Sequence, residues 1–248
     1  MKHLILANWK MSPSSIKEAR ELFEYTKTAV GKMRAVSVVI APPAVYIATL
    51  ASAYKGNKVA FSAQSIDTYE DVIHTGALSP KQYKSVGAEY CLIGHSESGD
   101  TLDDLRVKTF LAIKYGLTPI VFVGESVRDV AGHYLTTIRE QILITLKELS
   151  AGQINDIVFC YEPVWAVGQS EALDSYGVHQ MALYIRKVLV EEYGASVARK
   201  MRILYGGSVK IGNISEILEI EDIDGVAVGR ASTDKDVFVK LLRVANKA

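Results

Sequence analysis

Three chemically reactive side chains follow short apolar runs of this 248-residue chain. Lys10, His95 and Glu162 each come at or just past the end of such a run. Taken singly, they read as a solvated lysine, a structural histidine and an ordinary ion-pair partner. Taken together, a cation, an imidazole and a carboxylate form a set for proton transfer, in which a base removes a proton and its partners stabilise the developing oxyanion.

Glycines and a serine form a second candidate site. Gly206, Gly207 and Ser208 follow one apolar run, and Gly229 and Arg230 follow another. Glycine lets backbone N–H groups approach a ligand closely, and a helix N-terminus nearby favours phosphate. Either group alone is also typical of a plain turn, but the pair together predicts a phosphate-binding site.

Eight short, β-rich apolar runs are distributed along the chain. Most are nearly continuous rather than alternating, as expected for strands that are covered on both faces. They span residues 3–9, 35–42, 59–64, 88–95, 118–125, 156–163, 201–208 and 223–230.

Helical patterns separate these runs. The periodicity predicts helices over residues 15–32, 101–115, 127–149, 176–193 and 234–246. Ser15 and Glu18 have the spacing of a capping box, and Ser79-Pro80 is typical of an N-cap followed by proline at the first helical position.

Eight strands alternating with helices over this length predict an α/β fold, a single (β/α)8 barrel that spans residues 1–248 as one domain. A doubly wound open sheet is the alternative, although it usually has fewer strands. The carboxyl ends of barrel strands converge on one face, where the active sites of such enzymes lie. The polar residues at these ends are Asn8, Lys10, Gln64, His95, Glu125, Glu162 and Ser208.

Four motifs resemble those of the triosephosphate isomerase family, in the same order along essentially the whole chain. They are Asn-Trp-Lys-Met at 8–11, Gly-His-Ser-Glu at 94–97, Tyr-Glu-Pro-Val-Trp-Ala at 161–166 and Tyr-Gly-Gly-Ser-Val at 205–209. The resemblance implies a TIM barrel that interconverts dihydroxyacetone phosphate and D-glyceraldehyde 3-phosphate through an enediolate, in glycolysis and gluconeogenesis. It implies no cofactor and no metal.

The resemblance also implies roles for the catalytic residues. Glu162 would be the base that moves a proton between C1 and C2, and His95 the neutral electrophile that donates to the enediolate oxygens. Lys10 would supply positive charge, and Asn8 would line the same pocket. Glu97 matches a buried carboxylate near the lysine.

Further positions match the phosphate site of the family. By resemblance, Gly168, Ser208, Gly229 and Arg230 would offer backbone N–H groups to the phosphate. We expect the Arg230 guanidinium to lie toward the outer rim, where Asp224 or Asp234 could pair with it.

The stretch after Glu162 has the composition of a moving lid, although a surface loop would look similar. By resemblance, Pro163, Val164 and Trp165 form its hinge and the Tyr205 hydroxyl latches it when closed. Glu125 would be the partner of Trp165.

Two departures leave the substrate open. The lid sequence at 168–173 is not the usual one for the family, and Arg230 stands where most members have a second glycine. Both changes look like those of relatives that isomerise four-carbon tetrulose phosphates by the same mechanism. A catalytically silent barrel used for binding is a third hypothesis, which the intact catalytic set argues against.

The resemblance implies a homodimer in which the loop at 71–79 enters the partner subunit. His74 lies at its tip, whereas Ala77 and Ser98 stand where the family has an intersubunit glutamate–arginine pair. Because both partners are missing together, no uncompensated charge is left in the contact. We therefore expect a dimer that depends little on salt.

Composition limits the partners. Lys and Arg total 28 and so do Asp and Glu, so no broad field attracts nucleic acid or an anionic membrane. Cys91 and Cys160 lack metal or disulfide spacing. The uncharged stretch 35–54 could span a bilayer by length, but Pro42-Pro43 breaks it into a strand and a helix. We expect a cytoplasmic protein with a small phosphorylated sugar as its substrate.

Overall fold

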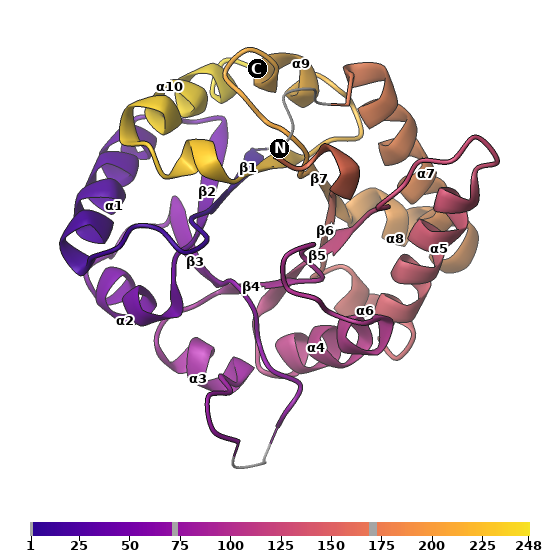
Figure 1. Cartoon of the computed structure of the whole chain (residues 1–248), viewed down its shortest axis with the longest axis horizontal. Helices are drawn as coiled ribbons and strands as arrows, with labels where there is room; N and C mark the ends of the chain where they lie inside the picture. The colour runs from indigo at the N-terminus through magenta and orange to yellow at the C-terminus, as the bar shows by residue number, and fades with distance from the viewer. Residues whose placement is uncertain (1, 71–73, 169–172) are drawn as a thin grey trace.

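A computed structural model describes residues 2–70, 74–168 and 173–248 of the chain. Eight parallel strands close into a barrel in chain order (Figure 1), which confirms the predicted (β/α)8 barrel and excludes the open sheet. The strands are β1 (His3–Asn8), β2 (Val36–Ala41), β3 (Val59–Ala63), β4 (Tyr90–Ile93), β5 (Thr118–Val123), β6 (Val158–Tyr161), β7 (Arg202–Tyr205) and β8 (Gly225–Val228).

Alternation of side chains explains why the strand sequences are continuously apolar. In β1, Leu4 and Leu6 belong to a small cluster drawn from alternate strand positions, which fills the barrel. Ile5 and Ala7 belong to the larger cluster between the strands and the helices. Since successive side chains of a strand point to opposite faces, both faces of each strand are buried.

Helices form a ring around the strands (Figure 1). They are α1 (Ile16–Gly31), α2 (Ala44–Ser52), α3 (Pro80–Ser85), α4 (Leu102–Lys114), α5 (His133–Leu146), α6 (Ala151–Ile154), α7 (Ser175–Tyr193), α8 (Ala195–Lys200), α9 (Ile214–Leu218) and α10 (Lys235–Ala245). Two 3-10 turns, η1 (Val164–Ala166) and η2 (Arg230–Ser232), follow β6 and β8. The stretch 35–54 forms β2 and α2, as predicted.

The helix predicted over 127–149 is too long at both ends. Residues 127–132 form a loop, and α5 begins at His133. The Asp129 carboxylate accepts the backbone N–H of His133, and Gly132 has a left-handed backbone with φ of 81°. A side chain that satisfies backbone donors in this way competes with helix formation, which explains the late start of α5.

Of the two predicted N-caps, Ser79 forms as predicted and Ser15 forms only in part. Ser79 caps α3 through a complete capping box with Gln82, and Pro80 is the first helical residue, as predicted. Ser15 accepts the N–H of Glu18, but the Glu18 carboxylate bonds to Ser14 instead of returning to Ser15. The predicted capping box is therefore only half formed.

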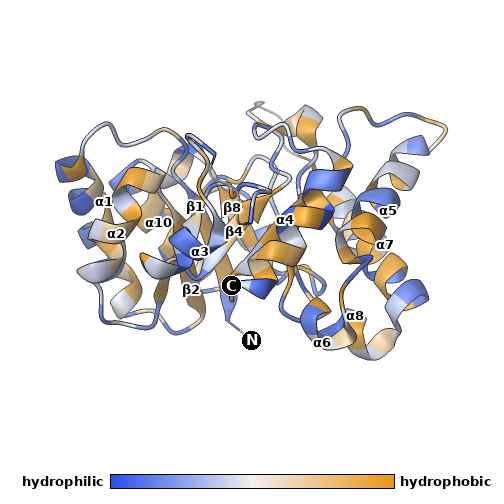
Figure 2. Ribbon diagram, turned by 90° about the horizontal axis from the view of Figure 1, so that it is seen from below, coloured by the Kyte–Doolittle hydropathy of each residue, from blue (hydrophilic) through white to orange (hydrophobic). Residues whose placement is uncertain are grey.

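The loops that follow the strands lie at the end of the barrel opposite the marked chain N-terminus (Figure 2). The helices in this view mix hydrophilic and hydrophobic residues along their length. Within the described residues, no helix is both long and apolar enough to cross a membrane.

Candidate active site

The carboxyl ends of β1, β4 and β6 bring three candidate residues together inside the barrel mouth. Asn8 ends β1, His95 follows β4 by two residues, and Glu162 follows β6 directly. All three side chains are buried. The His95 Nε2 atom lies 3.5 Å from Glu162 Oε1, so residues far apart in the sequence form one polar site.

The hydrogen bonds of His95 define its tautomer. Its Nδ1 atom accepts the backbone N–H of Glu97 at 3.1 Å. In a neutral ring the proton therefore lies on Nε2, the nitrogen that faces Glu162. A neutral imidazole with Nε2–H directed into the site can donate a hydrogen bond to a ligand oxygen.

Glu162 is held in place by a residue that the sequence did not single out. Its Oε2 atom accepts the backbone N–H of Ser96 at 3.0 Å. The carboxylate is almost fully buried, so this hydrogen bond compensates in part for lost water. No sequence signal identifies a backbone donor of this kind, because it depends on how the loop after β4 folds.

Lys10 has a left-handed backbone with φ of 52°, which is unusual for a residue other than glycine. The Asn8 side chain accepts its N–H at 3.0 Å. Gln64 donates to the carbonyl oxygens of Lys10 and Ala41, both at 2.8 Å. These bonds hold a strained conformation, which is characteristic of functional sites.

The Lys10 ammonium forms an ion pair with Glu97. The hydrogen bond from Lys10 lowers the pKa of Glu97, and the Lys10 charge acts in the same direction. Glu97 therefore lies next to Lys10, as the resemblance implied. Its side chain is 58 % exposed in the single chain, however, so the expected burial is not found within the described part of the chain.

The turns after β7 and β8 lie beside this site. Asn213 holds the first turn by donating to the Ser208 carbonyl oxygen and accepting the N–H of Lys210. Ser232 holds the second by donating to the carbonyl oxygens of Gly229 and Asn8. The predicted phosphate loops are thus anchored by two side chains that sequence patterns did not identify.

Arg230 begins η2 and its side chain is exposed, in agreement with a position on the rim. The expected ion pairs are not formed with the described residues. Asp224 instead accepts the N–H of Ile203 and pairs with Arg186 at 3.9 Å. Asp234 accepts backbone N–H groups at the start of α10.

The predicted hinge packs against a buried carboxylate. Trp165 donates its indole N–H to Glu125 at 2.9 Å, as the resemblance implied. The Tyr161 hydroxyl also donates to Glu125, and Arg128 lies 3.5 Å away. Pro163 precedes η1, and the Val164 N–H donates to the Glu125 backbone.

Gly168 is the last described residue before the tip of the predicted lid, and Tyr205, its predicted latch, ends β7. Burial raises the pKa of the Tyr205 hydroxyl to about 12, while the nearby Leu173 backbone lowers it by less. Gly168 has φ of 74°. The tip of the predicted lid, residues 169–172, lies outside the described residues.

A cavity of about 160 Å³ adjoins His95 and Glu162. Its lining includes Asp100, Phe122 and Val164. The Phe122 ring meets the His95 ring edge-on, with centroids 5.0 Å apart. Across the described ranges, no cluster of three His, Cys, Asp or Glu side chains could hold a metal ion.

Comparisons with known proteins agree with this geometry. The sequence matches the family model for triosephosphate isomerase over residues 3–245. A triosephosphate isomerase of Moorella thermoacetica is 38 % identical over 244 residues, which cover 96 % of this chain and 97 % of that protein. One from Streptococcus equi subsp. zooepidemicus is 36 % identical over 250 residues, 99 % of each chain. The strand-end site and these matches together show that the chain belongs to the triosephosphate isomerase family.

Proposed function

We propose that this protein is an isomerase that interconverts dihydroxyacetone phosphate and D-glyceraldehyde 3-phosphate. The observation that supports this most directly is the buried contact between the His95 and Glu162 side chains, with Nε2 and Oε1 3.5 Å apart. Family membership supports the same reaction. The geometry offers no reason to prefer a tetrulose phosphate.

Glu162 is the proposed base. A proton next to a carbonyl is weakly acidic, so it can be removed only if the enediolate is stabilised as it forms. Glu162 would leave Ser96, take the proton from one carbon of the substrate and return it to the neighbouring carbon. The substrate is thus isomerised without any net change in the enzyme.

His95 and Lys10 are the proposed stabilisers of the enediolate. The His95 Nε2–H can donate to the two substrate oxygens in turn, because each oxygen is a carbonyl in one triose phosphate and a hydroxyl in the other. The Lys10 ammonium adds positive charge on the same rim, and Asn8 fixes the backbone that presents it. Charges act more strongly in a site from which water is excluded.

The phosphate group is proposed to bind backbone N–H groups of Gly168, Ser208, Gly229 and Arg230. The turns after β7 and β8 are already held by Asn213 and Ser232, so they lose little conformational entropy when the ligand binds. The lid hinged at Pro163, Val164 and Trp165 would then exclude water, with Tyr205 as its latch.

We also propose that the protein acts as a homodimer. Large apolar side chains are exposed between β1 and α1, in the first turn of α2 and between β3 and α3, at Met11, Val45 and Leu78. The described part of the β3–α3 connection extends beyond the ring of helices (Figure 1). Exposed apolar side chains in such number are typical of an interface between subunits.

A coupled turnover assay tests the activity. We expect conversion of both triose phosphates, with kcat/KM for dihydroxyacetone phosphate above that for an erythrulose phosphate. One extra hydroxymethyl group changes binding by about 1–3 kcal/mol, so the preference can be as small as tenfold. A preference above tenfold for the tetrulose phosphate would overturn the proposed substrate.

A further inference from the structure

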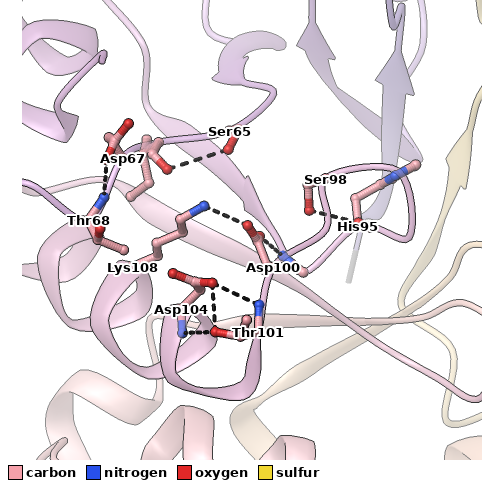
Figure 3. Close-up of polar contacts among 11 residues, drawn as sticks. Ser65, Asp67, Thr68, His95, Ser98, Asp100, Thr101, Asp104 and Lys108 are labelled. Atoms are coloured by element: carbon pink, nitrogen blue, oxygen red, sulfur yellow. Dashed lines mark hydrogen bonds and ion pairs between the residues drawn. The ribbon is translucent and has the colours of Figure 1, made fainter. Parts of the chain in front are cut away.

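A buried ion pair lies next to His95 and outside the proposed catalytic set. Lys108, on α4, contacts Asp100 with its Nζ atom 2.6 Å from Oδ1 (Figure 3). The two side chains are only 11 % and 4 % exposed. Burying two charges is costly, so a pair at this position calls for an explanation beyond general stability.

The second oxygen of Asp100 reaches the segment that bears the histidine. Asp100 Oδ2 accepts the backbone N–H of Gly94 at 2.7 Å. Gly94 immediately precedes His95 and has φ of 74°, a conformation that side chains rarely adopt. A Cβ atom there would lie 2.8 Å from the Phe122 carbonyl oxygen, so the backbone is closely fitted at this point.

Asp100 itself has a fixed position. It comes directly before Thr101, the N-cap of α4, which forms a complete capping box with Asp104 (Figure 3). Lys108 projects from α4, and its Nζ atom contacts Oδ1 of the Asp100 carboxylate, the oxygen that does not bond to Gly94. The carboxylate is therefore tied to the first turns of α4, and through Gly94 it ties the end of β4 to that helix.

Hydrogen bonds within the loop link its backbone to the histidine. Ser98 donates both its N–H and its hydroxyl to the His95 carbonyl oxygen, at 2.8 and 2.7 Å (Figure 3). Glu97 donates its N–H to Nδ1. The ring orientation thus depends on where the loop between Gly94 and Asp100 lies.

Packing alone does not hold this loop. The cavity of about 160 Å³ borders it on one side, with Gly94, His95, Gly99 and Asp100 in its lining. Side chains facing a cavity lose the contacts that would otherwise restrict them. Polar contacts must therefore restrict the position of this loop, and the hydrogen bond from Gly94 to Asp100 anchors its start.

We propose that Asp100, held in place by its ion pair with Lys108, is a positioning residue for His95. By accepting the Gly94 N–H, it holds the histidine so that Nε2–H reaches the oxygens of the enediolate. This inference rests on the proposed isomerase function. It predicts an effect on kcat rather than on KM, because His95 acts most strongly on charge that develops during the reaction.

Two matched double variants test the proposal. Asp100→Asn with Lys108→Met removes both charges but keeps an oxygen that can accept the Gly94 N–H. Asp100→Leu with Lys108→Met removes both charges and the acceptor as well. Neither variant leaves a lone buried charge, so both avoid the usual cause of severe destabilisation. Asp103→Asn with Arg106→Met, which removes an exposed ion pair of α4, is the control.

We expect kcat of the asparagine variant and of the control to stay within about threefold of the wild-type value. The leucine variant should lose roughly 10- to 100-fold in kcat with KM within about twofold. This is less than the roughly 10²- to 10⁴-fold contribution of a positioned acid or base, because His95 itself is retained. Equal losses in the asparagine and leucine variants would overturn the proposal, as would full activity of a folded leucine variant. Circular dichroism and thermal unfolding establish folding, and Asp100→Ala with Lys108→Met replaces the leucine variant if that does not fold.

Nitrogen-15 NMR of labelled histidine tests the same link without substrate. In the wild type, the His95 signals should show protonated Nε2 and unprotonated Nδ1. The leucine variant should show broadened or averaged signals, whereas the asparagine variant should match the wild type. Unchanged signals in the leucine variant would refute positioning by Asp100. Failure of the wild type to convert triose phosphates would refute the proposed function instead, and the NMR result would still decide the positioning role.

Discussion

Glu162 accepts the backbone N–H of Ser96, and its Oε1 atom lies 3.5 Å from His95 Nε2. As the proposed base, it would leave the Ser96 contact to reach the substrate. Glu162→Gln retains an oxygen for Ser96 but cannot act as a base. We expect kcat to fall by at least roughly 10²- to 10⁴-fold, with little change in thermal unfolding. Steady-state kinetics measure this, and Glu140→Gln, on the exposed face of α5, is the matched control. Activity above a tenth of wild type would mean that another group is the base.

Lys10 and Glu97 make a pH-dependent contact at the mouth of the barrel. The hydrogen bond from Lys10 holds the pKa of Glu97 below its usual value of 4.5. A depressed carboxylate pKa stabilises the fold above the unfolded value, and this contribution is lost as the pH falls through the folded value. The contact is thus intact near neutral pH and disappears only in acid.

Lys10→Met should therefore raise the pKa of Glu97. Carbon-13 NMR titration of the side-chain carboxylate would show the change directly. Lys27→Met removes a surface ion pair with Glu24 and should leave the titration of Glu97 unaltered. An unchanged Glu97 titration in Lys10→Met would show that the lysine is not what depresses this pKa.

At the scale of elements, Gln64 joins the ends of three strands. It follows β3 and donates to the carbonyl oxygens of Lys10, two residues past β1, and of Ala41, the last residue of β2. Gln64→Leu keeps the approximate shape but leaves two carbonyl groups without this donor. We expect the free energy of unfolding to fall by about 1–3 kcal/mol.

The same substitution should also lower kcat/KM, because the left-handed backbone of Lys10 loses a support. Chemical denaturation and steady-state kinetics measure the two effects. Gln82→Leu, which disrupts a capping box remote from the site, should destabilise the fold without lowering kcat/KM in the folded protein. Equal effects of both variants on kcat/KM would contradict a specific role for Gln64.

The strands were predictable because each is buried on two faces and therefore reads as a continuous apolar run. The polar ends of these runs also include His95 and Glu162, whose side chains lie 3.5 Å apart. The start of α5 was not predictable from periodicity, because Asp129 satisfies backbone donors just before it. Likewise the Ser96 backbone N–H donates to the Glu162 side chain, which is distant in sequence, and the Asp100 carboxylate accepts the Gly94 N–H within one loop. Apolar periodicity contains no signal for such contacts.

At the scale of the whole molecule, the proposed dimer would cover side chains that a single chain leaves exposed. Met11 is 96 % exposed beside Lys10, and Glu97 is 58 % exposed although it pairs with that lysine. A partner subunit over this rim would shield both. Removal from water would also strengthen the Lys10–Glu97 pair, so assembly and the electrostatics of the site would be coupled.

If the proposed dimer buries His74, we expect its association to weaken in acid. The His74 ring stacks on Tyr69 with centroids 4.3 Å apart, and both lie in the β3–α3 connection, whose segment 71–79 is expected to enter the partner. Histidine gains a positive charge as the pH falls from about 7.5 to about 5.5, and burying that charge without a partner is unfavourable. Salt should matter little, because Ala77 and Ser98 bring no charges to the contact.

Sedimentation velocity across a dilution series, at low and high salt and at both pH values, tests this assembly. We expect a dimer at micromolar concentration near pH 7.5 in either salt, and weaker association near pH 5.5. His74→Asn, which remains neutral, should remove the pH dependence, whereas His133→Asn on α5 should not. A fully active monomer at micromolar concentration would refute the dimer. Dissociation by modest salt would show instead that charged pairs hold the subunits together, because screening weakens exposed charge pairs and leaves apolar contacts intact.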